Sequence, residues 1–566
     1  MKLKSFQINF LIIFLLYFSN YILNFEKKVT VISILIFILV FLFKKHLFNQ
    51  NKLENYKFIE IEISNSLVLS FLFLLTILLQ NHLLNYETIT WDVSSYLVAS
   101  QEIGLNKIPF ETQWESKGPL LIYIYYFLSN LTNKNYIYFK LINDVVLFFS
   151  VVTIYFGMQK LSQKNKLLSF VSCIYFLLIT SHEWFISEFS EIYCLVVLGI
   201  VYLIFDQNNL ENNNFYLLGF LFSILTLINQ GAIVLVIPYL IRLIYLQRDK
   251  NLFFWFVKTG IGFLVPYLFF IFLYYKNNLL EIFVANYVSI PLGYTSSSNG
   301  SSISELLVVL RRLFQFNQFL YYFVFICFSF LLLNLFKTRK FSLIFDINVL
   351  NFLFGIAFYF IAGHNYAHHL FYLIFYFSFL FYIFMQEQMN LLISILFFAL
   401  LTTSFNLFPY SIFNLSNTKM LYENYPLRSL SEEIDQYFDT DYKILALDYV
   451  LILFYLDKPN VSYIIHPGNH YEDFIVNELL RLNKIKTNEF NHISYLIETE
   501  PEVIICNATD IINGEAVNRD FYNCAVDDYK KNYYKIETEI FKNNPNLNLY
   551  KNPYEKINVY LKINEN

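Results

Sequence analysis

The sequence predicts a polytopic α-helical membrane protein that ends in a small water-soluble α/β domain. Of its 566 residues, 57% are hydrophobic and 15% are charged, whereas a soluble domain carries about 25% charged residues. Apolar runs that suit membrane spans of roughly 17–25 residues recur along the first three quarters of the chain. From about Asn417 onward, charged residues, Pro and Asn return to the levels of a soluble protein.

The apolar runs predict about thirteen transmembrane helices. Two of them lie in residues 1–63 and precede a core membrane domain, residues 64–416; the soluble domain covers residues 417–566. The predicted spans are 6–24, 29–43, 64–84, 137–157, 166–181, 189–205, 214–229, 231–247, 252–275, 317–336, 345–362, 366–385 and 389–408.

The Lys and Arg residues of the short loops predict the orientation of the chain. They cluster in four loops, 44–57, 160–166, 242–250 and 337–340, and such loops normally face the cytoplasm. This places the N-terminus in the cytoplasm of a bacterial cell and the C-terminal domain outside its cytoplasmic (inner) membrane, together with the first extracytoplasmic loop, 85–135. Pro119–Leu131 is apolar but short, so we expect an interfacial or re-entrant helix, because another span would invert every later loop.

Alternating apolar segments predict an α/β fold for the tail. Lys443–Leu447, Val461–Ile465 and Glu502–Cys506 resemble short buried strands, and Asp473–Leu482 resembles a helix between them. Residues 547–561 suggest a closing hairpin. The net charge of −4 provides no basic field for nucleic acid, so DNA and RNA are excluded as partners.

The polar loop that follows the third predicted span contains the most distinctive motifs. Asp92, Tyr96 and Ala99 have helical spacing and share one face, and Gly104 suits the end of that helix. The loop closes with the run Glu115-Ser-Lys117-Gly-Pro-Leu. Charged groups are costly at membrane depth, so charges clustered at one face of a membrane domain suggest a functional site, although Asp92 could also be an interfacial helix cap and Lys117 part of a turn.

These motifs resemble the first extracytoplasmic loop of GT-C glycosyltransferases. The likeness is to the bacterial group that contains protein O-mannosyltransferase-like and lipid A aminoarabinose transferase-like enzymes. It rests on the acidic residue Asp92, on Tyr96 four residues later, and on the patterns A…IG….PF and E.KGPL. Residues 363–370, Gly-His-Asn-Tyr-Ala-His-His-Leu, resemble that group's opening of a late helix. Three features depart from the pattern: Val93 replaces a second acid, Ser116 separates Glu115 from Lys117, and two spans precede the core.

The resemblance implies a GT-C-like fold and sugar transfer from a polyprenyl-phosphate donor. The acceptor would be a lipid, glycan or protein of the cell envelope, and the reaction would invert the anomeric centre at the surface of the lipid bilayer. Asp92 would be the catalytic base or orient the acceptor, and Lys117 would stabilise the departing phosphate. The sequence identifies no cofactor; whether a divalent metal binds, with Asp92 among its ligands, stays open.

Further residues are candidates for binding the substrates. Tyr96 and Glu115 belong to the motifs above, and Glu188 and Glu191 either line the cavity or belong to an ordinary solvated loop. Arg311 and Arg312 break the positive-inside trend and suggest phosphate binding. His364, His368 and His369 are expected to contact phosphate or acceptor, because no carboxylate or cysteine nearby in the sequence completes a zinc site.

Two other functional classes compete with a transferase of this kind. An O-antigen-type polymerase or ligase would favour a large late outer loop and Arg-rich sites. A lipid-linked sugar transporter or flippase would show repeated halves and broken helices near mid-membrane. The early acidic loop favours the first class, and an inactive scaffold with the same fold stays an alternative.

Overall fold

A computed structural model describes most of the chain from residue 64 onward. The described residues are 64–87, 90–162, 165–205, 214–246, 252–297, 302–317, 319–320, 322–324, 327, 346–362, 366–438, 441–487, 492–507, 511–512, 515–516, 533–536 and 557–562. The predicted N-terminal spans 6–24 and 29–43, most of the predicted span 317–336, and His364 lie outside these residues.

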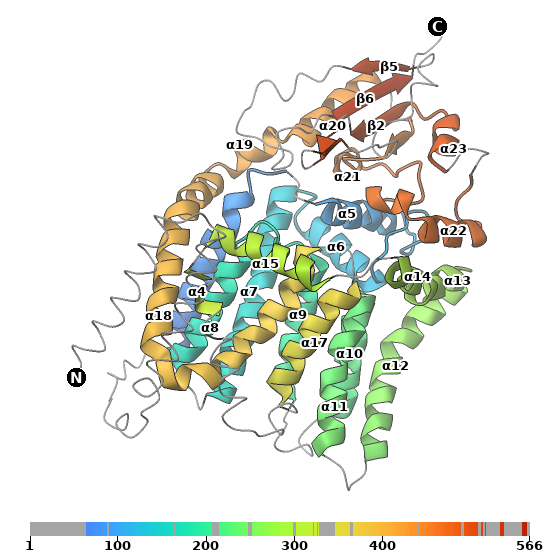
Figure 1. Ribbon diagram of the computed structural model, residues 1–566. Coiled ribbons are helices and arrows are strands. Elements are labelled where there is room, and N and C mark those ends of the chain that lie inside the picture. Colours follow the sequence, from blue (N-terminus) through green and yellow to red (C-terminus); the bar gives the residue numbers. More distant parts are fainter. Residues whose placement is uncertain are drawn as a thin grey trace.

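The helical part forms a bundle whose helices begin at recognisable caps (Figure 1). The side chains of Asn135, Asn165 and Asn214 each accept a hydrogen bond from the backbone N–H three residues later, which starts the helices that follow them. The elements of the bundle are α4 (Asn65–Gln80), η2 (Asn81–Leu83), α5 (Trp91–Gly104), α6 (Pro119–Leu131), α7 (Tyr136–Leu161), α8 (Lys166–Thr180), α9 (Ser190–Ile204), α10 (Phe215–Ile228), η4 (Gln230–Leu235), α11 (Ile237–Leu246), α12 (Leu252–Lys276), α13 (Leu280–Tyr287), α14 (Ser289–Ser297), α15 (Ile303–Phe316), α17 (Ile347–Ala362), η6 (Ala367–Leu370) and α18 (Phe371–Ser416).

The helices follow the apolar runs of the sequence. Within the described part of the chain, four segments are long and apolar enough to cross a membrane: Asn65–Leu83, Tyr136–Leu161, Leu252–Lys276 and Ile395–Ser416. Shorter apolar helices correspond to most of the other predicted spans. The predicted spans 366–385 and 389–408 lie in one continuous helix, α18, because no Gly or Pro interrupts the chain between residues 371 and 408.

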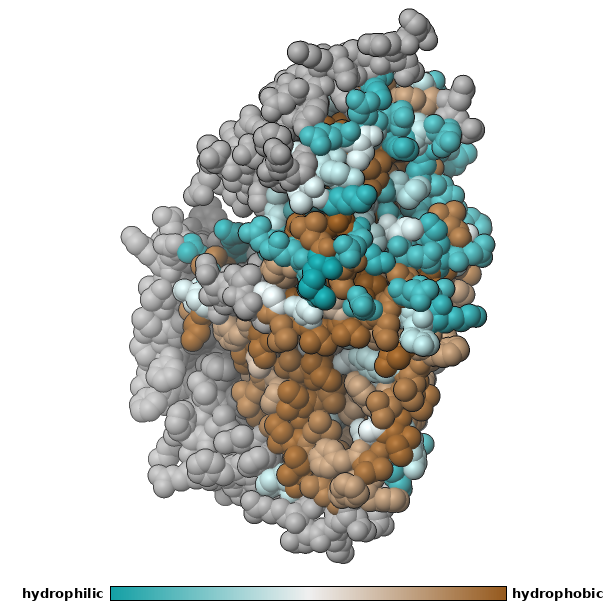
Figure 2. All heavy atoms as spheres, turned by 90° about the vertical axis from the view of Figure 1, so that its right-hand side faces the viewer, coloured by the Kyte–Doolittle hydropathy of each residue, from teal (hydrophilic) through white to brown (hydrophobic). Residues whose placement is uncertain are grey.

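The surface of the bundle is apolar where a bilayer would surround it. Figure 2 shows hydrophobic side chains over the lower part of one face and hydrophilic side chains gathered above them. On α12, Phe253 is 82% exposed and Phe272 is 66% exposed. Such a surface would be costly in water, so it supports the predicted membrane domain.

The C-terminal domain sits at one end of the bundle, which we call the domain-facing end (Figure 1). Helices α5 and α6 lie across this end. Helix α6 has only 13 residues, which agrees with the expectation that it does not span the membrane. Helix α12 begins at the opposite end and reaches α13 and α14 at the domain-facing end.

The tail contains a small sheet, as predicted. Its elements are α19 (Thr418–Glu423), α20 (Pro426–Tyr437), β1 (Ile444–Ala446), α21 (Leu451–Leu456), η7 (Pro467–Tyr471), α22 (Asp473–Arg481), α23 (His492–Glu498), β2 (Val503–Asn507), β3 (Ile511–Ile512), β4 (Glu515–Ala516), β5 (Tyr533–Ile536) and β6 (Ile557–Lys562). One sheet has the order β1-β2-β6-β5, with β1 parallel to β2 and the other pairs antiparallel, and β3 pairs with β4.

The prediction of a strand at Val461–Ile465 is wrong. This segment forms no strand of the sheet, because its backbone turns to the loop of the membrane domain that precedes α6. The Trp114 N–H donates to the Tyr463 carbonyl over 2.6 Å, and the Ile465 N–H donates to the Trp114 carbonyl over 3.2 Å. The predicted hairpin 547–561 is described only at β6, which pairs with β2 and β5.

Side-chain hydrogen bonds fasten the tail to the domain-facing end. The Gln113 amide and the Asn460 backbone bond reciprocally, over 3.2 Å and 3.1 Å. The buried carboxylate of Glu87 accepts the N–H groups of Leu427 and Arg428 at the start of α20 over 2.6 Å and 3.0 Å, where a helix favours an acceptor. The tail therefore has a defined position above the bundle.

Candidate active site

A cavity of about 640 Å³ lies between the domain-facing end of the bundle and the tail. Several elements that are distant in the sequence supply its wall: the start of α5, the loop before α6, η4, α15, α17, η6 and η7. Of the predicted site residues, Asp92, Lys117, Arg312, His368 and His369 line it.

Asp92 occupies the first turn of α5, as the helical spacing predicted. The Thr90 hydroxyl accepts the Asp92 N–H over 3.0 Å and caps the helix. The carboxylate itself is therefore not needed as the cap and is directed at two histidines. Its Oδ1 lies 3.3 Å from Nε2 of His466, and its Oδ2 lies 4.0 Å from Nε2 of His368.

His466 holds the Asp92 carboxylate from the C-terminal domain. Its Nδ1 accepts the Gly468 N–H over 3.1 Å, and this bond assigns the proton of the imidazole to Nε2, which faces Asp92. The Trp91 ring packs edge-on against the His466 ring. Burial raises the pKa of the Asp92 carboxyl, but the hydrogen bond from His466 and the charges of His466, His368 and Lys117 together outweigh burial, so the pKa lies below its ordinary value.

Replacing His466 with Gln is expected to move the acid limb of the pH–rate profile to higher pH. In the wild-type protein Asp92 stays ionised well into the acidic range; without the His466 bond, burial is left to raise its pKa. Initial rates of sugar transfer between pH 4 and pH 9 would measure this shift, with His82→Gln as the control at a half-buried histidine outside the cavity. Profiles that coincide would contradict the role assigned to His466.

Backbone contacts fix the position of Lys117. The Lys117 carbonyl accepts the Asn286 amide over 3.0 Å, and the Ser116 carbonyl accepts the Gln230 amide over 2.8 Å. A Cβ atom at Gly118 would overlap the Leu227 carbonyl oxygen, so the run requires glycine at this position.

The Lys117 ammonium is charged in this setting. Burial lowers its pKa, but the carboxylates of Glu191, Asp92 and Glu115 together raise it above the ordinary value. A half-buried cation and a half-buried carboxylate therefore face the same cavity, an arrangement that suits a substrate with one acidic group and one reacting hydroxyl.

Other predicted site residues do not line this cavity. Tyr96 is buried in α5 and packs edge-on against Tyr125. Glu115 is buried, and its Oε1 accepts the Ser116 N–H over 2.7 Å. Glu188 lines a separate small cavity with Lys140 and Asp144. Arg311 is exposed on α15 and is not part of the wall, whereas its neighbour Arg312 is.

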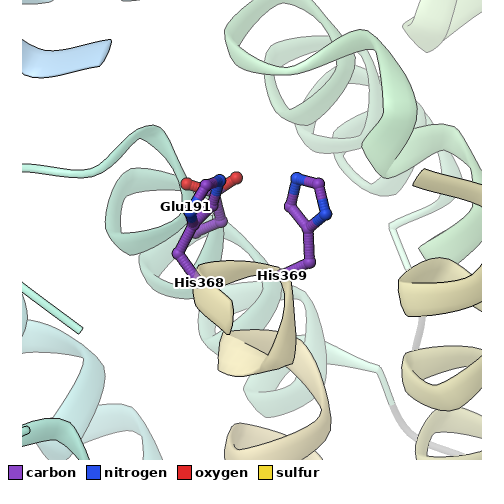
Figure 3. A group of neighbouring side chains, drawn as sticks. All are labelled: Glu191, His368 and His369. Carbon is purple, nitrogen blue, oxygen red and sulfur yellow. The ribbon is translucent and has the colours of Figure 1, made fainter. Parts of the chain in front are cut away.

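The structure brings Glu191 to two of the predicted histidines. One ligand atom from each of Glu191, His368 and His369 lies within 4.8 Å of the others (Figure 3). The expectation that no carboxylate accompanies these histidines is therefore wrong, because it considered only neighbours in the sequence. Asp92, the metal ligand that the sequence left open, does not belong to this group.

The tail contributes site residues that were not predicted from the sequence. His466, Asn469, Glu472 and Ile475 all line the cavity, and the Asn469 amide nitrogen is buried without a hydrogen-bond partner among the described residues. The run Ile465-His-Pro-Gly468, a histidine followed by a turn, was the available signal.

Comparison with known proteins supports the fold. No family model matches the sequence, and no curated protein matches it. The chain is similar in structure to ArnT from Cupriavidus metallidurans bound to undecaprenyl phosphate, with a TM-score of 0.54 and 9% identity over 88% of this chain and 98% of that chain. It is also similar to the apo state of that protein, with a TM-score of 0.51 and 8% identity over 88% and 97%.

These matches confirm the resemblance in fold. The protein has an ArnT-like helical membrane fold with a small C-terminal sheet, as the likeness to lipid A aminoarabinose transferase-like enzymes predicted.

Proposed function

We propose that this protein is a membrane glycosyltransferase that moves a sugar from a polyprenyl phosphate to an extracytoplasmic lipid, glycan or protein, with inversion. The observation that carries the proposal is the placement of the Asp92 carboxylate and the Lys117 ammonium on the wall of one cavity. A fold similar to that of ArnT, one structure of which is described as bound to undecaprenyl phosphate, supports the choice of donor.

The two groups suit the two ends of a single displacement. The Asp92 carboxylate accepts the proton of the acceptor hydroxyl while the hydroxyl oxygen bonds to the anomeric carbon. The bond between that carbon and the phosphate oxygen breaks, and its electron pair passes to the phosphate. The Lys117 ammonium offsets the charge that the phosphate gains. Attack from the face opposite the phosphate inverts the anomeric centre.

The position of the cavity suits a donor with a lipid chain. Val309, Phe358 and Ile361 form part of the wall contributed by the bundle, whereas His466, Asn469 and Glu472 form part of the wall contributed by the tail. We infer that the polyprenyl chain stays against the bundle, within the bilayer, and that the sugar faces the tail. The membrane domain, residues 64–416, would then bind the donor, and residues 417–566 would help to bind the acceptor.

Sugar transfer by the purified protein tests the proposal. The assay would supply polyprenyl-phosphate sugars that carry a radiolabel in the sugar, together with an extract of the membranes that contain the acceptor. We expect labelled acceptor to form at a rate proportional to the amount of protein. Transfer that occurs only from a diphosphate-linked oligosaccharide would favour a polymerase or ligase. Movement of lipid-linked sugar across vesicles without transfer would favour a flippase.

A further inference from the structure

We infer that Asn469 and Glu472 of the C-terminal domain recognise the sugar of the donor and select a sugar without an acidic group. This inference rests on the proposed function for the identity of the ligand as a lipid-linked sugar. Asn469 lies in η7 and Glu472 directly follows it, and both line the part of the cavity wall that the tail contributes.

Asn469 presents a hydrogen-bond donor that the described part of the chain does not use. The residue is 8% exposed, and its amide nitrogen has no hydrogen-bond partner among the described residues. The backbone fixes its position, because the Asn469 N–H donates to the His466 carbonyl over 3.0 Å and the Gly468 N–H donates to Nδ1 of His466 over 3.1 Å. Most buried polar atoms in proteins have a hydrogen-bond partner, so an oxygen of a bound ligand would complete this amide.

Glu472 presents a carboxylate on the same wall. Its backbone carbonyl accepts the N–H groups of Ile475 and Val476 over 2.8 Å and 3.0 Å at the start of α22, but its side chain makes no capping hydrogen bond. The side chain is half-buried at the cavity. An ionised carboxylate accepts hydrogen bonds and donates none. It therefore favours a ligand with hydroxyl groups and repels a second carboxylate.

The lysine and the arginine of the cavity wall come from the bundle. They are Lys117 and Arg312, and the described part of the tail supplies neither residue type to the wall. The His466 imidazole of the tail is directed at Asp92, with 3.3 Å between Nε2 and Oδ1. The phosphate of the donor would therefore lie toward the bundle, whereas the sugar would meet the amide and the carboxylate of the tail.

A tryptophan lies next to this polar pair. Trp91 lines the cavity, and its ring packs edge-on against the His466 ring, with centroids 5.9 Å apart. A Cβ atom at Gly468, the residue before Asn469, would lie 4.0 Å from the Trp91 ring. Small-molecule sites combine aromatic side chains with a few placed polar groups. The apolar face of a sugar ring would pack on this indole while its hydroxyls reach the amide and the carboxylate.

Equilibrium binding to the purified full-length protein, without acceptor, tests this inference. The probes are polyprenyl phosphate itself and two matched pairs of polyprenyl-phosphate sugars, glucose with glucuronic acid and galactose with galacturonic acid. The members of a pair differ only in the acidic group. We expect at least one neutral sugar to bind at least about 10-fold more tightly than its acidic counterpart, because the acidic sugar places a second carboxylate near Glu472.

Substitutions separate recognition of the sugar from binding of the lipid phosphate. Asn469→Ala should weaken binding of the neutral sugar by about 2–10-fold, and Glu472→Gln by about 10-fold, as expected for hydrogen bonds of a neutral and of a charged group. Both variants should bind polyprenyl phosphate as the wild type does, and Glu472→Gln should discriminate less against the acidic sugar. The controls are Asn477→Ala, at an exposed position of α22, and Glu433→Gln, at a half-buried position of α20; neither residue lines the cavity.

The outcomes distinguish this inference from the proposed function. Neutral sugars that bind no more tightly than their acidic counterparts would overturn the inference. So would variants, shown to be folded by thermal unfolding, that keep the wild-type affinity for the neutral sugar or lose affinity equally for polyprenyl phosphate. Because no acceptor is present, the expected binding pattern without sugar transfer would contradict the proposed function alone. Transfer at equal rates from neutral and acidic donors would contradict the inference alone.

Discussion

Asp92→Asn is expected to lower kcat/KM for sugar transfer by about 10²–10⁴-fold, the usual contribution of a general base. Asparagine keeps an oxygen that can accept the bond from His466, whose Nε2 lies 3.3 Å from Oδ1, so the geometry of the site should survive. It cannot accept the proton of the acceptor hydroxyl. Initial rates with radiolabelled polyprenyl-phosphate sugar would measure the loss.

The matched control for this variant is Asp473→Asn. Asp473 is an exposed aspartate in the first turn of α22 and does not line the cavity. It should leave the rate and the melting temperature unchanged. A folded Asp92→Asn variant that transfers sugar at the wild-type rate would remove Asp92 from the chemistry and move the search to Glu183 or Glu472, which also line the cavity.

Lys117→Met is expected to lower kcat by about 10²–10³-fold, the range observed when one group that stabilises a developing anion is removed. Methionine resembles lysine in length, and the backbone contacts at Lys117 and Ser116 do not involve the side chain. The substitution therefore removes the charge and leaves the loop in place. Single-turnover rates at saturating donor would measure the effect on the chemical step.

Two comparisons sharpen this result. Lys107→Met removes a half-exposed lysine of the same loop that does not line the cavity, and it should have little effect. Lys117→Arg keeps a positive charge and should recover part of the rate. If Lys117→Met raised KM and left kcat intact, the ammonium would bind the donor equally in the ground state and in the transition state.

Local patterns were sufficient to predict the parts of the site that depend on one segment. The spacing of Asp92, Tyr96 and Ala99 predicts α5, and the run closed by Gly118 and Pro119 predicts the turn that presents Lys117. Helix caps and helical periodicity act over a few residues, so a single sequence reveals them.

Residues that are close in the sequence have different neighbours in the fold. Glu188 and Glu191 are three positions apart, yet Glu188 faces a small cavity with Lys140 and Asp144, and Glu191 faces His368 and His369. Arg311 and Arg312 diverge in the same way on α15. Glu188 precedes α9, whereas Glu191 lies in its first turn. Arg311 and Arg312 are adjacent residues of one helix, and such residues point about 100° apart. Only the packing of the neighbouring elements decides which of these side chains meets the cavity.

The sequence by itself determined the helical membrane fold, the C-terminal α/β segment and the helix that carries Asp92, because hydrophobicity and helical periodicity are properties of short segments. Only the tertiary structure decided that His466 holds Asp92 and that Glu191 joins His368 and His369. The first contact depends on the tail docking onto the loop before α6 through bonds such as Gln113–Asn460, between residues 347 positions apart. The second depends on the packing that brings the first turn of α9 to η6. Contacts at such separations arise from the packing of the whole chain, and no local pattern of residue types specifies them.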